Sequence, residues 1–138
     1  MLKKICFYHA GCPDGFGAVW ATRASWGDSG RYVARGHEDR VRLDECRDAL
    51  VAFVDIAPSN DELRGLAEVA EQVVILDHHV TARDRLESDP TLMNDLEADG
   101  HMLHFDLGHS GAVLSWRYFH PDEEVPDLLR YVEDQDLW

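Results

Sequence analysis

Residues 72–79 read QVVILDHH, and this stretch indicates the fold class. Its apolar part is short and rich in β-branched residues, which is typical of a strand buried on both faces of a parallel sheet. A second run of the same kind, LVAFVDI, occupies residues 50–56. The two runs predict a buried parallel sheet with polar residues at the carboxyl ends of its strands.

Strand-like and helix-like segments alternate along the rest of the chain. We expect further strands at 5–8, 31–34 and 101–105. Helices are expected at 18–26, 39–49, 60–70, 110–119 and 127–133, with a short helix and a loop within 81–99. This alternation predicts an α/β fold: a five-stranded, mostly parallel, Rossmann-like sheet with helices on both faces. Residues 1–138 are expected to form a single domain.

The composition is that of a globular protein, with 45% apolar and 29% charged residues. The chain contains no apolar run long enough to span a membrane and no recognisable signal peptide, so we expect a cytoplasmic protein with no membrane partner. The three cysteines are an odd number without a secretory context, which argues against a disulfide framework.

The formal net charge of −14 comes from 27 acidic against 13 basic residues. A broad nucleic-acid-binding face needs clustered Lys and Arg, so this balance argues against one. A short anionic substrate held through metal ions remains compatible with it, because dense carboxylates attract divalent cations.

Polar, metal-competent residues gather where three of the expected strands end. Because ligands bind at the carboxyl ends of the strands in an open parallel sheet, we expect these residues to converge on one edge. They are His9 with Cys12 and Asp14, then Asp55, then Asp77-His78-His79.

The Asp77-His78-His79 triplet suits a divalent transition metal such as Mn²⁺, Co²⁺ or Zn²⁺. Successive residues leaving a strand point in different directions, so one histidine can ligate while the other faces substrate. Asp77 could orient a ligating imidazole from behind. Taken alone, the triplet is equally compatible with a polar turn capped by an aspartate.

Five segments together resemble the DHH phosphoesterase superfamily. The triplet at 77–79 is similar to the signature that names the family, and HAGCPDGFGA at 9–18 resembles its first motif. Asp55 in FVDIAPS resembles the second motif. Residues 110–112, Ser-Gly-Ala, resemble the helix start after the third, and DQDLW at 134–138 resembles the last. The ordered set covers nearly the whole chain.

The resemblance implies a two-metal hydrolase, usually Mn²⁺-dependent, with Mg²⁺, Co²⁺ or Zn²⁺ as alternatives. Such enzymes cleave phosphoanhydride or phosphodiester bonds in pyrophosphate, polyphosphate, short oligonucleotides, single-stranded DNA or cyclic dinucleotides. For this chain we expect phosphodiester bonds of small nucleotides or short oligonucleotides. One ion would be bound by His9 and Asp55. The other would be bound by residues that include the bridging Asp55: Asp14, Asp55, His78 and Asp134.

The resemblance also assigns roles around the metals. Asp77 would orient, and His79 would face the substrate phosphate as a catalytic residue beside Asp55. Asp136 competes with Asp134 for the last ligand position, and aligning the motif favours Asp134. The substrate phosphate would meet the start of the helix that begins at residue 110: His109, Ser110 and Gly111.

Two features depart from the family pattern. Cys12 occupies the place of the first acid of motif one, and it is either a ligand, a neighbour of the ligands or a turn residue. Cys is a softer donor than Mn²⁺ prefers. The family's C-terminal substrate-binding domain is also missing from these 138 residues. We therefore expect a fragment, or a domain completed by a partner or a homodimer.

Two other function classes remain open. One is a non-catalytic module that binds a metal or a nucleotide, which the cysteine and the missing domain would favour. The other is a flavodoxin-like signalling domain with acids at its strand ends. That class predicts one Mg²⁺ site and no role for His9, His78 or His79.

Overall fold

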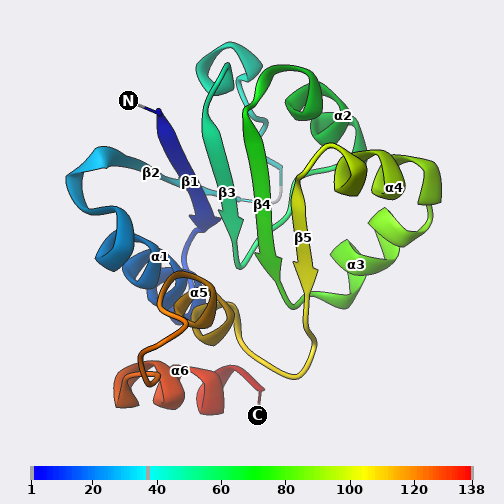
Figure 1. Cartoon of the computed structure of the whole chain (residues 1–138). Coiled ribbons are helices and arrows are strands. Elements are labelled where there is room, and N and C mark those ends of the chain that lie inside the picture. Colours follow the sequence, from blue (N-terminus) through cyan, green and yellow to red (C-terminus); the bar gives the residue numbers. More distant parts are fainter. Residues whose placement is uncertain (1, 37, 138) are drawn as a thin grey trace.

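The computed structural model describes residues 2–36 and 38–137 (Figure 1). Its centre is a five-stranded sheet in the order β2-β1-β3-β4-β5, and all four strand pairings are parallel. The predicted α/β class is confirmed. The strands are β1 (Lys4–His9), β2 (Gly30–Arg35), β3 (Leu50–Val54), β4 (Gln72–Asp77) and β5 (Met102–Phe105).

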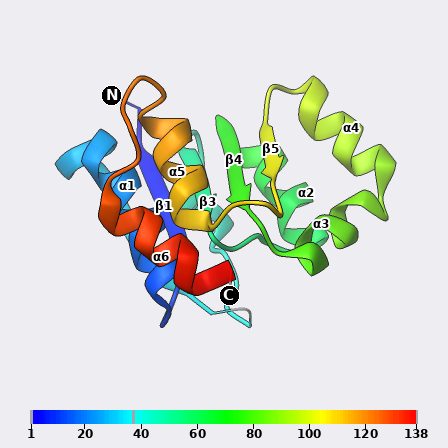
Figure 2. The same ribbon diagram turned by 90° about the horizontal axis from the view of Figure 1, so that it is seen from below.

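Helices cover both faces of this sheet. One face carries α1 (Pro13–Trp26) and α5 (Gly111–Phe119), and α6 (Asp127–Leu137) packs on these two helices from outside (Figure 2). The other face carries α2 (Asn60–Val69), α3 (Val80–Glu87) and α4 (Pro90–Ala98). No helix in the described part of the chain is long and apolar enough to cross a membrane.

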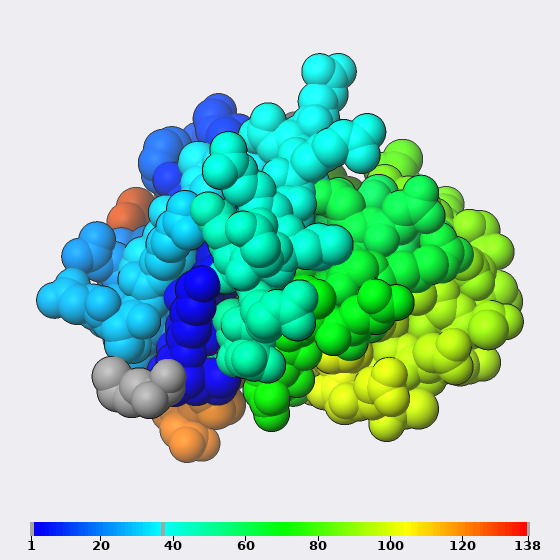
Figure 3. Space-filling view, turned by 90° about the horizontal axis from the view of Figure 1, so that it is seen from above, coloured from blue at the N-terminus to red at the C-terminus, as the bar shows by residue number. Residues whose placement is uncertain are grey.

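Alternating side chains of the strands supply two separate cores. Phe7, Phe53 and Ile75 face α2, α3 and α4, whereas Cys6 and Ala52 face α1 and α5. The central strands are therefore buried on both faces of the sheet, as the apolar runs indicated. Figure 3 views the amino ends of the strands, where turquoise atoms of the segment that leads into β3 lie between the blue N-terminal segment and the green atoms of the following elements.

Helix α1 begins five residues earlier than the sequence suggested. The prediction was wrong because glycines and a proline were taken as breaks, although Pro is favoured in the first turn of a helix. Cys12 caps this helix, its Sγ accepting the backbone N–H of Gly15. Gly15 has no room for a side chain, because an added Cβ would lie 2.0 Å from the carbonyl oxygen of His9.

Two other segments differ from expectation. Residues 39–49 contain only a short 3₁₀ turn (Leu43–Cys46) instead of a helix, and Cys46 is buried there. Residues 81–99 hold parts of two helices, α3 and α4, rather than one helix and a loop. By contrast, α2 starts where the sequence predicted, with Ser59 and Glu62 forming a capping box at its N-terminus. All three cysteines are free thiols.

Candidate metal centre

The parallel register brings three strand ends to one level. Tyr8 of β1, Val54 of β3 and Leu76 of β4 are aligned across the three central strands. The site begins at the residue that follows each of them: His9, Asp55 and Asp77. The chain runs outward in opposite directions from β1 and β3, and a crevice forms at such a reversal point. The predicted convergence is confirmed for these residues.

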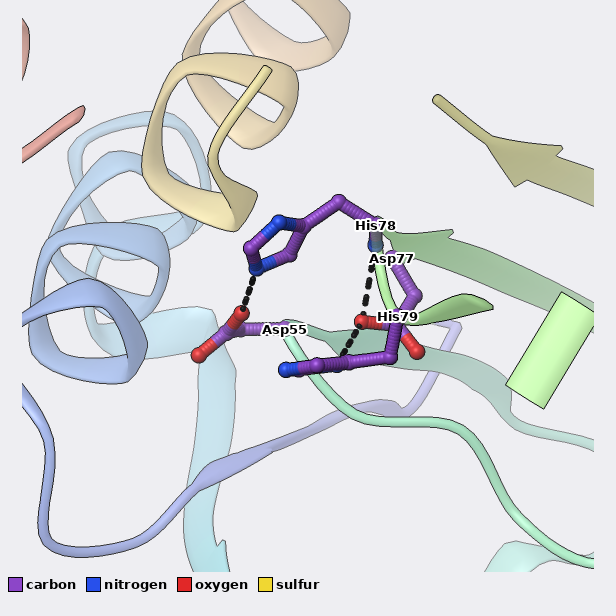
Figure 4. Close-up of side chains that lie close together, drawn as sticks. All are labelled: Asp55, Asp77, His78 and His79. Atoms are coloured by element: carbon purple, nitrogen blue, oxygen red, sulfur yellow. Dashed lines mark hydrogen bonds and ion pairs between the residues drawn. The ribbon is translucent and has the colours of Figure 1, made fainter. Parts of the chain in front are cut away.

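Asp55 sits at the centre of the cluster in an unusual backbone conformation. Its φ is +60°, a left-handed value that is uncommon outside glycine, and its side chain is almost fully buried. Oδ1 lies 3.0 Å from His78 Nε2, and Oδ2 lies 3.4 Å from His9 Nδ1. Figure 4 shows His78 aimed at one Asp55 oxygen while the other points away. Asp55 can therefore serve two ligand groups at once.

His78 Nε2 is surrounded by three carboxylates. It lies 3.1 Å from Asp14 Oδ2 and 3.5 Å from Asp136 Oδ2, in addition to the Asp55 contact. Burial alone would lower the pKa of His78, but the hydrogen bonds with Asp14 and Asp55 outweigh it and raise the pKa to about 10. The imidazolium holds this group of acids together in the absence of a metal.

Asp14 is buried against the start of α5. Its carboxylate accepts the backbone N–H of Gly111 at 2.9 Å and of Ala112 at 2.8 Å, where the helix N-terminus favours negative charge. Burial raises its pKa, but the bonds with His78 and these amides lower it to about 2. Burial, together with the charge of Asp14, raises the pKa of Asp55 to about 7. Asp14 and Asp55 thus both depend on the positive charge of His78.

Asp77 holds the second histidine of the triplet. Its Oδ1 lies 2.7 Å from His79 Nδ1 and accepts the backbone N–H of His78 at 2.9 Å. The bond with Asp77 raises the pKa of His79. The predicted orienting role of Asp77 is thus directed at His79, not at His78. Among the described residues, the buried Oδ2 of Asp77 has no hydrogen-bond partner.

A second group of potential ligands lies on the other side of Asp55. Cys12 Sγ is 3.5 Å from His9 Nδ1 and donates to Asp55 Oδ2 at 3.4 Å. The pKa of Cys12 is raised to about 11, first by burial and further by the charge of Asp55. Cys12 is therefore not an isolated turn residue, because it contacts two of the predicted metal ligands.

The structure brings Asp136, and not Asp134, to His78. Both aspartates are exposed on α6, but Asp136 Oδ2 lies 3.5 Å from His78 Nε2 and Asp134 is in none of the ligand groups of the described residues, so the geometry corrects the preference for Asp134. Residues two apart on a helix point in roughly opposite directions, whereas those three, four and seven apart share a face. Leu129 is buried, and Glu133 and Asp136 follow it at this spacing. This helical spacing predicts Asp136 as the ligand, whereas aligning the motif favoured Asp134.

The residues predicted to meet substrate phosphate have partners within the protein. Ser110 Oγ caps α5 by accepting the N–H of Val113, and its own N–H donates to Glu133 at 2.8 Å. His109 Nδ1 lies 3.3 Å from the same carboxylate. The N–H of Gly111 is bonded to Asp14. Sequence reasoning missed Glu133, which lies one helical turn before Asp136 on the same face of α6.

The donors fit divalent metal ions. Three groups each place their ligand atoms within 4.8 Å of one another: His9, Cys12 and Asp55; Asp14, His78 and Asp136; and Asp55, Asp77, His78 and His79. Carboxylate and imidazole donors suit Mn²⁺, Co²⁺ or Zn²⁺. The crowded buried carboxylates and the unpaired Asp77 oxygen are the features that a cation would stabilise.

A sizeable cavity lies elsewhere. It has a volume of about 710 Å³ and lies against α1 and α6, lined by aromatic and aliphatic side chains such as Tyr8, Phe16 and Trp20. None of the predicted ligand residues lines it. The polar site is therefore distinguished by its ligand chemistry and not by its volume.

Comparisons with known proteins place few limits on the function. The chain is 30% identical over 148 aligned residues to uncharacterized protein R106 of Acanthamoeba polyphaga mimivirus. The match covers 97% of this chain and 33% of that protein, so the chain spans about a third of this relative's length. No protein-family model matches the chain, and no solved structure matches it.

Proposed function

We propose that this protein is a metal-dependent phosphoesterase that resembles the DHH superfamily. It would hydrolyse phosphodiester bonds in small nucleotides or short oligonucleotides. One observation carries the proposal: Asp55 directs one oxygen to His78 and the other to His9, so that two ligand groups meet at a shared carboxylate. A carboxylate that serves both ligand groups suits a two-metal phosphoesterase.

The protein's own residues would hold the ions in two groups. His9, Cys12 and Asp55 form one group, and Asp14, His78 and Asp136 form the other. When bound, two divalent ions would activate a water molecule and neutralise the phosphoryl oxygens. Mn²⁺ is the ion that the family resemblance suggests, with Mg²⁺, Co²⁺ and Zn²⁺ as alternatives.

His79 is the residue best suited to the leaving group. Asp77 fixes its ring through Nδ1, and its side chain is 35% exposed, so it can meet a substrate. The bond with Asp77 raises the pKa of His79, which favours the protonated form of the ring. It would stabilise negative charge on the phosphate or donate the proton at Nε2 to the departing oxygen.

The charge of the protein restricts the substrate. A net charge of −14 repels long polyanions, whereas a short phosphoester needs only local compensation at the cluster. The proposed substrates are therefore dinucleotides and short oligonucleotides rather than duplex DNA.

The test is hydrolysis of bis-p-nitrophenyl phosphate with Mn²⁺, Mg²⁺, Co²⁺ or Zn²⁺ added, followed by a chelator. We expect turnover with at least one ion, its loss on chelation, and its loss in Asp14→Asn. Asp61→Asn is the matched control, because Asp61 is a fully exposed aspartate on α2 and should leave turnover unchanged. No ion-dependent turnover in the wild-type protein would overturn the proposal.

A second candidate is a module that binds metal without catalysis. The amides and hydroxyl at the start of α5 favour it, since they are bonded to Asp14 and Glu133 instead of facing an open phosphate site. The same experiment separates the two. Metal binding without turnover for any phosphoester would select the binding module.

A further inference from the structure

The His9–Cys12–Asp55 group has the dimensions of one face of a tetrahedral metal site. The three ligand atoms are separated by 3.5 Å (Sγ to Nδ1), 3.4 Å (Sγ to Oδ2) and 3.4 Å (Nδ1 to Oδ2). A tetrahedral zinc site with ordinary bond lengths has edges of about 3.5–3.6 Å to sulfur and about 3.3–3.4 Å between nitrogen and oxygen. An octahedral site of the same bond lengths has edges of about 2.9–3.1 Å.

We propose that these three residues form a thiolate-containing site for Zn²⁺, with Cys12 as a direct ligand. This inference deepens the proposed function, on which it rests, because it names the ion at one half of the same centre. It also distinguishes the two halves chemically. The group formed by Asp14, His78 and Asp136 offers only nitrogen and oxygen, which suit harder ions such as Mn²⁺.

Burial and Asp55 raise the pKa of the Cys12 thiol, but its position at the start of α1 suits a thiolate bound to a cation. The thiol caps α1, a helix of 14 residues, so its sulfur faces the positive end of the helix dipole. The Gly15 N–H already points at the sulfur from 3.2 Å. On binding, the S–H bond would break heterolytically, the sulfur electron pair would go to the ion and the proton to solvent. The thiolate and the Asp55 carboxylate would balance the two charges of Zn²⁺.

The site also has an open side. The His9 side chain is 22% exposed and Cys12 is partly exposed, whereas Asp55 is buried beneath them. Three protein ligands with a fourth position open to solvent are the arrangement of a catalytic zinc site, in contrast to the four protein ligands of a structural one.

The test uses Co²⁺ as a spectroscopic probe for Zn²⁺, without substrate. We expect a near-ultraviolet thiolate-to-cobalt charge-transfer band in the wild-type protein and its loss in Cys12→Ser. Serine is a good helix N-cap, so Cys12→Ser keeps the capping role and removes only the sulfur. Cys46→Ala is the matched control, because Cys46 lies in the core outside this group and its loss should leave the band intact.

Competition titrations complete the test. Cys12→Ser should lower the Zn²⁺ affinity at least about tenfold and change the Mn²⁺ affinity much less. Cys12→Asp, with an oxygen donor, should shift the preference towards Mn²⁺. Circular dichroism checks that each variant is folded. Absence of the band in wild type, or its survival in Cys12→Ser, would overturn the inference.

The outcome is separable from that of the hydrolysis assay. A charge-transfer band without any hydrolysis supports this inference and overturns the proposed function. Hydrolysis with Mn²⁺ but no band in the cobalt-loaded protein supports the proposed function and overturns this inference.

Discussion

Gly111→Ala should damage the centre, because the added methyl group has no room beside Asp55. The added Cβ would lie 2.6 Å from the Cβ of Asp55 and 2.7 Å from its Oδ1. Neither neighbour can yield easily, because Asp55 is almost fully buried and already has a left-handed backbone. The start of α5 must therefore move away from the sheet, and with it the two amides that bind Asp14.

The size of the effect follows from these contacts. Overpacking a buried site costs about 1–3 kcal/mol. Loss of one hydrogen bond to the charged Asp14 adds about 1.5–3 kcal/mol. We therefore expect a fall of about 2.5–6 kcal/mol in the free energy of unfolding, a large part of the ~5–15 kcal/mol that stabilises a typical domain.

Urea unfolding in the presence of a chelator measures this loss without a contribution from metal binding. The midpoint should fall by roughly 1–3 M at a slope of about 2 kcal/mol per M, which is the middle of the usual range for urea. Gly108→Ala is the matched control, because its added Cβ meets nothing closer than Asp106 Oδ1 at 3.3 Å. A midpoint for Gly111→Ala equal to that of the control would refute the close packing of α5 on Asp55.

Three further predictions concern the charged side chains. Asp136→Asn should weaken divalent-metal binding about tenfold in calorimetric titrations while Asp134→Asn leaves it unchanged; equal effects would contradict the assignment. Asp77→Asn should lower the pKa of His79, so the alkaline limb of the pH–rate profile should move to lower pH; an unmoved limb would remove His79 as the acid. The pKa of His78 is raised from 6.5 to about 10, so its protonated ring stabilises the metal-free fold. This stabilisation is fully present below pH 6.5 and is lost as the pH rises through about 10. Metal-free protein should therefore unfold more easily at about pH 10 than at pH 7, and His78→Gln should flatten this dependence.

The sequence was sufficient for those parts of the fold that depend on local pattern. The apolar runs at 50–56 and 72–76 became β3 and β4, and Ser59 and Ser110 cap the expected helices. The parallel arrangement then required His9, Asp55 and Asp77 to meet at one edge. Their convergence was therefore predictable without any coordinates.

The errors arose where tertiary contacts override local pattern. Gly15 and Gly17 suggested a turn, but they lie inside α1 because the helix approaches His9 and Ala112 too closely for any side chain. The choice between Asp134 and Asp136 depends on how α6 is rotated against α1 and α5. That rotation is set by the burial of Leu129, and a motif alignment carries no information about it.

The central claim is that the cluster around Asp55 hydrolyses phosphodiester bonds with the help of divalent ions. The most direct measurement is the initial rate of cleavage of a ribodinucleotide into mononucleotides by the wild-type protein and by Asp55→Asn, each with Mn²⁺ or Zn²⁺ and again with a chelator. We predict metal-dependent cleavage by the wild-type protein and none above background by Asp55→Asn, whose neutral amide cannot join both ligand groups. Equal cleavage by the two proteins, or cleavage that persists in the chelator, would contradict the account.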